Sequence, residues 1–133
     1  MNSIENYLFE LSRYKKSDAI INYLKDNKIN FDVTDENGNT LLIWAVVNKA
    51  PNLVEILLDK GANPNIQNAQ KMTALHYAVT MGRVQIAKLL VENGADKEIK
   101  NIDEQTPIQC AHKSMVGDFV KVFVEADIAE SEK

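Results

Sequence analysis

Residues 73–96 read TALHYAVTMGRVQIAKLLVENGAD, and this stretch decides the fold. Its apolar residues recur at helical spacing in two short segments, which predicts helices over about residues 74–81 and 84–92. Thr73 precedes the first segment and can accept a backbone N–H bond at the helix start. Gly94 follows the second segment and can adopt the left-handed conformation that ends many helices. The stretch is therefore predicted to form a pair of helices joined by a tight turn.

The same pattern recurs every 33 residues without a gap. The equivalent positions include Thr40, Thr73 and Thr106; Leu42, Leu75 and Ile108; Ala45, Ala78 and Ala111; Leu57, Leu90 and Phe123; and Gly61 and Gly94. Helices of about eight residues do not persist alone in water, so they must be ordered by packing against each other and against the neighbouring units. The repeated alanine suits this packing because a small side chain permits close helix approach.

Four units of 33 residues account for 132 of the 133 residues, so the repeats fill the chain. We expect a single domain over residues 1–133 with a degenerate N-terminal capping unit, two regular units and a C-terminal capping unit, at 1–34, 35–67, 68–100 and 101–133. The remaining helix pairs are expected at 3–13 and 17–26, at 41–48 and 52–59, and at 107–114 and 117–125.

The composition excludes several classes of protein. Fifteen Lys and Arg against nineteen Asp and Glu give a net charge of -4, which disfavours binding to nucleic acid or to anionic membranes through basic residues. The longest apolar run, Leu41 to Val47, is far shorter than the roughly 20 residues of a membrane-spanning helix, and residues 1–16 lack the apolar region of a signal peptide. The single cysteine, Cys110, cannot form an internal disulfide, which favours a reducing compartment. We expect a cytoplasmic protein without membrane insertion, and the nucleus is the alternative.

The repeated residues resemble those of the ankyrin repeat family. The resemblance rests on TALHYA (73–78), IAKLL (86–90) and NGAD (93–96), and again on NGNTLLIWA (37–45), VEILL (54–58), GANPN (61–65) and TPIQCA (106–111). It implies an all-α fold, an ankyrin-repeat α-solenoid of stacked helix-turn-helix pairs with hairpin-like loops between them. The family histidine is present only as His76, and Asp127 stands where the last unit would have its terminal glycine.

The residues capable of chemistry are better explained by structure than by catalysis. His76 follows Thr73 by three residues, so its ring and the threonine hydroxyl can form a hydrogen bond at the helix start. Cys110 shares its repeat position with Trp44 and Tyr77, which predicts packing rather than nucleophilic reactivity. The glycines are scattered over turns and helix ends and form no phosphate loop. We expect no enzyme activity, no metal and no cofactor.

Positions that the repeat pattern does not require are free to contact a partner. The resemblance implies a concave face of loop tips and first helices, and it places there Glu36, Asn37, Asn39, Trp44, Asn48, Ala69, Gln70, Met72, Tyr77, Thr80, Met81, Ile102, Asp103, Gln105 and Lys113. Met72, Met81 and Ile102 are expected to be exposed apolar anchors. Trp44 and Tyr77 either contact the partner or fill space between units.

The sequence therefore predicts a non-catalytic module that binds a protein or peptide through the concave face. A regulatory subunit or inhibitor that covers the active site of a partner enzyme is the alternative, because it would use the same face. We expect the domain to be monomeric by itself. Its apolar last helix, with Phe119, Val120 and Val124, is expected to pack back, dimerise or dock on another protein.

Overall fold

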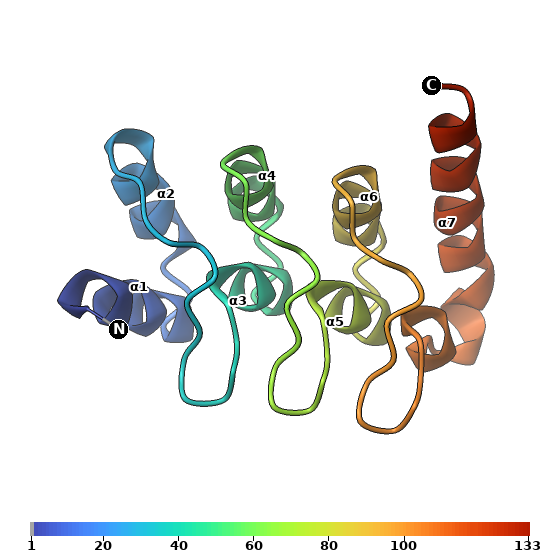
Figure 1. Ribbon diagram of the computed structural model, residues 1–133, viewed down its shortest axis with the longest axis horizontal. Helices are drawn as coiled ribbons and strands as arrows, with labels where there is room; N and C mark the ends of the chain where they lie inside the picture. Colours follow the sequence, from blue (N-terminus) through green and yellow to red (C-terminus); the bar gives the residue numbers. More distant parts are fainter. Residues whose placement is uncertain (1) are drawn as a thin grey trace.

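A computed structural model describes residues 2–133 and shows a row of paired helices (Figure 1). The elements in chain order are α1 (Ser3–Arg13), α2 (Ser17–Asp26), α3 (Leu41–Val47), α4 (Pro51–Asp59), α5 (Ala74–Thr80), α6 (Val84–Glu92), two short 3-10 turns η1 (Pro107–Cys110) and η2 (Lys113–Met115), and α7 (Val116–Ser131). No strand is present in this part of the chain. The all-helical stack predicted from the repeats is confirmed.

Local chemistry sets where the regular helices begin and end. The hydroxyl of Thr40 accepts the backbone N–H of Ile43 at 3.1 Å, which caps α3. Pro51 is the first residue of α4, a position at which a backbone N–H would have no acceptor within the helix, so proline loses no hydrogen bond there. Gly61 and Gly94 follow α4 and α6 with φ of +94° and +92°, a conformation that costs other residues energy. The caps and stops predicted for these helices are therefore confirmed.

The helices form two rows, and the core lies between and along them. Helices α1, α3 and α5 stack side by side and are followed by η1, while α2, α4, α6 and α7 form the second row (Figure 1). Leu42 and Leu75 from the first row and Leu57 and Leu90 from the second are almost completely buried. The apolar side chains of each pair are therefore buried between its two helices and against the neighbouring pairs.

Polar side chains also join each pair to the next. Asn48 donates its side-chain N–H to the carbonyl of Ser12 in α1 at 2.8 Å. Arg83 donates to the carbonyls of Val46 and Val47 at the end of α3, at 3.2 and 3.0 Å. These carbonyls lie in the last turns of α1 and α3, where the regular helical bonds end. The neighbouring unit adds a donor to the N–H groups that Lys15 and Lys49 already supply to Ser12 and Val46.

His76 supplies the link at the third junction. Its Nδ1 accepts the backbone N–H of Thr73 at 3.1 Å and lies 2.9 Å from the Thr73 hydroxyl, so the predicted histidine–threonine contact is confirmed. Because Nδ1 accepts, the neutral ring carries its proton on Nε2, which donates to the carbonyl of Gln105 at 2.9 Å. The side chain is fully buried, and this burial lowers the pKa of His76 below its usual value, opposed by the bond to Gln105.

The prediction of a first helix over 107–114 is wrong. The chain makes only the short turn η1, then becomes extended at Ala111 and His112 before the second turn η2. The physical reason lies at the position of His112, where the two regular units have the buried residues Val46 and Val79. A histidine there is exposed instead, and its Nδ1 accepts the N–H of Ser114 at 3.2 Å to begin η2. The last unit thus lacks a regular first helix.

Helix α7 is longer than the 117–125 segment predicted for it. It continues to Ser131 through Asp127, the residue that replaces the helix-ending glycine of the preceding units. Asp127 forms an ion pair with Lys97, which lies in the segment that follows α6. Without a glycine to take the left-handed conformation, no local signal stops the helix at this position.

The burial pattern predicts which leucines carry the stability of the stack. Leu90→Ala should lower the free energy of unfolding by about 2–5 kcal/mol, because it opens a cavity between α6 and its neighbours. Ile102→Ala, at a side chain that is 59% exposed, should change it by no more than about 0.5 kcal/mol. Urea denaturation of both variants checks the difference, and equal losses would contradict the division between core and surface.

The buried neutral state of His76 predicts a dependence of stability on pH. The unfolded chain takes up a proton near the ordinary pKa of 6.5, whereas the native state does so only at lower pH. Stability should therefore be complete above that value and decline as the pH falls below it, by at most about 1.4 kcal/mol per pH unit.

The matched variant is His76→Gln, because Gln109 at the equivalent position accepts the N–H of Thr106 at 2.8 Å in the same way. Urea unfolding at about pH 7 and about pH 5 should show a smaller decline for the variant than for the natural protein. An unchanged decline in the variant would assign the pH dependence to other groups.

Candidate functional site

Three hairpin loops project from the level of the first helices, on the side away from the second row (Figure 1). They span residues 34–40, 67–73 and 100–106, and with the exposed sides of α3, α5 and η1 we call them the hairpin face. Each loop is built on one buried residue, Asp35, Asn68 or Asn101. Its side-chain oxygen accepts the backbone N–H groups two and four residues later, at 2.9–3.1 Å. These bonds fix the shape of each loop.

The other polar atom of the same side chain binds the first helix. Asp35 accepts the indole N–H of Trp44 at 2.9 Å, whereas Asn68 donates to the hydroxyl of Tyr77 at 2.7 Å. An indole can only donate, which suits a carboxylate, while a phenol can accept from an amide. Trp44 and Tyr77 are half-buried and hold the loops against the helices. Their contacts support the space-filling interpretation. The sequence signal for this network is an acidic or amide residue that recurs every 33 positions, at Asp35, Asn68 and Asn101.

Adjacent loops are also joined to each other. The N–H of Ala69 donates to the carbonyl of Asn37, and the N–H of Ile102 donates to the carbonyl of Gln70, both at 3.0 Å. A Cβ atom at Gly38 would lie 3.0 Å from the backbone nitrogen of Ala69, so a larger residue there would press on the next loop. The three loops therefore form a connected rim.

Several side chains in the N-terminal half of the hairpin face bind partners within the molecule, while Glu36 and Asn37 remain exposed. Glu36 accepts from the Arg13 guanidinium at 2.5 Å, and Asn39 accepts from the Asn68 amide at 2.9 Å. Asn48 is half-buried and bonded to Ser12. Three residues predicted from the sequence to contact a partner thus have structural partners in this chain.

The C-terminal half offers more free side chains. Met81 is 41% exposed and Ile102 is 59% exposed. The other predicted residues exposed here are Ala69, Gln70, Thr80, Asp103 and Gln105. This half of the hairpin face therefore combines two accessible apolar side chains with polar neighbours.

Two predicted site residues need correction. Met72 is half-buried rather than exposed, and its sulfur accepts from the Asn101 amide at 3.3 Å. Lys113 is exposed but lies in η2, outside a first helix, because the helix predicted over 107–114 is absent. Neither residue has the setting that the repeat pattern predicted for it.

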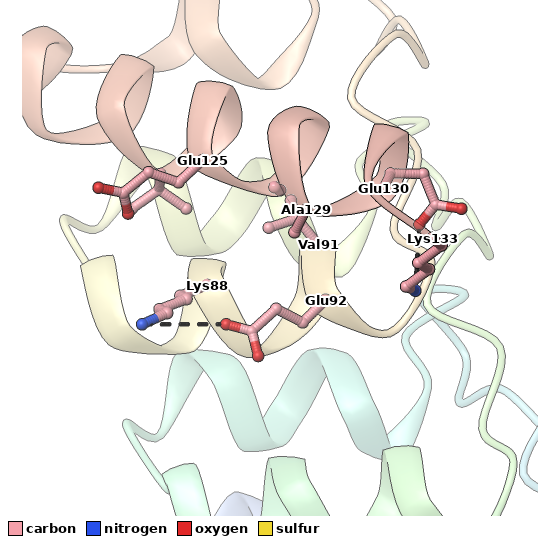
Figure 2. Close-up of a pocket in the computed structure, with 9 residues that line it drawn as sticks. Lys88, Val91, Glu92, Glu125, Ala129, Glu130 and Lys133 are labelled. Atoms are coloured by element: carbon pink, nitrogen blue, oxygen red, sulfur yellow. Dashed lines mark hydrogen bonds and ion pairs between the residues drawn. The ribbon is translucent and has the colours of Figure 1, made fainter.

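A groove of about 440 Å³ lies elsewhere, between α6 and α7 (Figure 2). Its lining is apolar at Val91, Val122, Ala126 and Ala129 and charged at Lys88, Glu92, Glu125, Glu130 and Lys133. Lys88 approaches Glu92 at 4.0 Å and Lys133 approaches Glu130 at 3.2 Å. Its far end is formed by the part of α7 that extends beyond the expected stop, which is why the repeat pattern did not predict this groove.

The groups capable of chemistry are arranged for structure. Burial raises the pKa of the Cys110 thiol, so the thiol stays protonated near neutral pH. Its sulfur lies 3.6 Å from the Asn101 amide and 3.7 Å from the Gln105 side-chain oxygen. Among residues 2–133 no three His, Cys, Asp or Glu side chains are gathered to hold a metal ion. The helices described here are all too short or too polar to cross a membrane.

The loop tips predict a stabilising substitution. Lys71 and Glu104 have φ of +58° and +60° at the loop position where the first hairpin has Gly38 at +79°. A side chain in this conformation costs about 1 kcal/mol or more. Lys71→Gly should therefore raise the free energy of unfolding by about 1 kcal/mol, measured by urea denaturation. Gln70→Gly is the control, since Gln70 precedes Lys71 in the same loop and does not itself have a positive φ. An equal gain there would refute the explanation.

Comparisons with known proteins agree with the helix pairs and hairpins. A family model described as ankyrin repeats, in three copies, matches residues 8–101. The crystal structure of the ankyrin repeat domain of Bcl-3, a member of the IkappaB protein family, is similar with a TM-score of 0.73 and 30% sequence identity. The match covers 86% of this chain and 50% of the Bcl-3 chain, so this chain spans about half the length of that one. A search of curated proteins gives no match. On the family match and this structural likeness, the chain belongs to the ankyrin repeat family.

Proposed function

We propose that the hairpin face binds a protein partner and that the contacts concentrate on its C-terminal half. The observation that carries this proposal is the exposure of Ile102 at 59% and Met81 at 41%, since neither the core nor the loop network uses these two side chains. Exposed aliphatic side chains beside polar loop tips suit the centre of a protein interface. Ankyrin repeat domains are generally protein-binding modules, which supports the same assignment.

The charges around Ile102 indicate the chemistry of the partner. Asp103 and Glu104 follow it and are exposed at the tip of the third hairpin. At the first hairpin, by contrast, Arg13 pairs with Glu36 and offsets its charge. A partner segment with an aliphatic side chain flanked by Lys or Arg would complement the third hairpin and would be less attracted to the first.

The matched pair Ile102→Lys and Ile4→Lys tests the location of the binding surface. Both isoleucines are exposed, but Ile4 lies on α1 at the far end of the stack. In quantitative affinity capture from lysate of the source cells, Ile102→Lys should deplete the bound partner about tenfold or more, because it removes an anchor and repels basic residues. Ile4→Lys should retain the partner.

Thermal melting should show that both variants remain folded. A partner lost equally with both variants, or with Ile4→Lys alone, would place the binding surface elsewhere. An activity assay on a captured enzyme, with and without the domain, distinguishes simple binding from inhibition of that enzyme.

A further inference from the structure

The outer side of α7 carries a second apolar surface, separate from the hairpin face. Val116, Val120, Val124 and Ile128 follow one another at intervals of four residues, and their exposed fractions run from 37% to 52%. The buried residues of α7, Phe119, Val122 and Phe123, lie on the opposite side and pack towards α6. Figure 1 shows no other described element on the outer side of α7. We call these four residues the α7 ridge.

At the end of α7 the chain does not take the path that leads from one regular unit to the next. In the regular units the chain leaves the second helix at Gly61 or Gly94 and then builds the next hairpin. At the equivalent Asp127 the chain remains helical and continues to Ser131. Asp127 instead forms an ion pair with Lys97, in the segment that follows α6.

Head-to-tail stacking of two copies is disfavoured. In such a stack, α7 of one copy would meet α2 of the next, because second helices stack on second helices along the row (Figure 1). The exposed side of α2 carries Asp18, Asn22 and Lys25, which share one helix face. Packing the α7 ridge on these side chains would desolvate them without providing partners.

The ridge is suited to pairing with itself. Residues spaced by four form the ridges that interdigitate when two helices cross, and Gly117 leaves the adjacent groove open for a partner side chain. If two copies of α7 run antiparallel about an axis near Val124, Lys121 of each lies about 3 Å along the helix axis from Glu125 of the other. Lys121 and Glu125 are both exposed, and neither forms an ion pair within residues 2–133.

We propose that the α7 ridge docks on the same ridge of a second copy of this chain, in an antiparallel two-fold pair. The contact buries Val120, Val124 and Ile128 around the axis and joins Lys121 to Glu125 of the other copy in two equivalent ion pairs. A two-fold contact closes on itself, so it yields a dimer and not a filament. This proposal replaces the expectation of a monomer and does not depend on the proposed function of the hairpin face.

Sedimentation velocity of the 133-residue chain over a range of concentrations tests the proposal. The natural protein should show a reversible equilibrium between monomer and dimer. Val124→Lys should raise the dissociation constant about tenfold or more, because it places two positive charges together at the centre of the contact. Tyr7→Lys is the control, since Tyr7 is also an exposed large side chain and lies at the opposite end of the stack, and it should leave the equilibrium unchanged.

Charge exchange tests the antiparallel arrangement itself. Lys121→Glu and Glu125→Lys should each weaken the dimer, and the double variant should restore it, because the two ion pairs reform with reversed sign. A protein that remains monomeric at every concentration would overturn the proposal. A dimer that Tyr7→Lys disrupts and Val124→Lys does not would overturn it as well, and failure of the double variant to recover would overturn the antiparallel pairing.

Discussion

The whole structure depends on one constraint, which is that no helix pair can cover its own apolar side. Helix α3 has seven residues and α4 has nine, lengths at which an isolated helix is unstable in water. Val46 and Leu57 nevertheless reach zero exposure because the pairs before and after them supply the missing contacts. Stability is therefore shared between neighbours along the row, and it must weaken wherever the row ends.

Apolar contacts alone do not fix which surfaces meet, and the polar links between units supply that information. Each of the three junctions has its own link, through Asn48 to Ser12, Arg83 to α3, and His76 to Gln105. A shift of one unit against another would leave these buried or half-buried groups without partners, at a cost of about 1–3 kcal/mol each. Because the three links use different chemistry, one unit cannot replace another in the row. The stack is thus more specific than its repeated apolar pattern implies.

Much of the fold could be predicted from sequence because the 33-residue period repeats the local signals. Thr40 and Gly61 each mark a helix boundary through their own chemistry, so no distant contact is needed to interpret them. The links made by Asn48 and Arg83 occur once each and join residues 36 or 37 apart, so the period contains no trace of them. The loss of the first helix in the last unit could have been predicted from sequence, since His112 occupies a position that is a valine in both regular units and is buried there.

The candidate site was predicted less completely than the fold, for a related reason. A position that varies between repeats is available to a partner only if no neighbouring unit binds its side chain. The sequence alone does not show such contacts. Glu36 and Asn39 vary and yet are engaged by Arg13 and Asn68, whereas Ile102 varies and stays accessible. The residues of the hairpin face that remain available to a partner are the variable ones whose side chains are not already bound within this chain.

The two exposed apolar surfaces lie on different sides of the stack, which affects how they would work together. The hairpins point away from the second row of helices, while the α7 ridge faces outward at the end of the row (Figure 1). Pairing through α7 would leave both hairpin faces accessible and hold them in one assembly. A partner with two binding segments would then bind the second face at a high effective concentration, and its affinity would rise without any new contact on the hairpin face. A modest contact at α7 would thereby strengthen a modest contact at Ile102 and Met81, provided that the partner can span both faces.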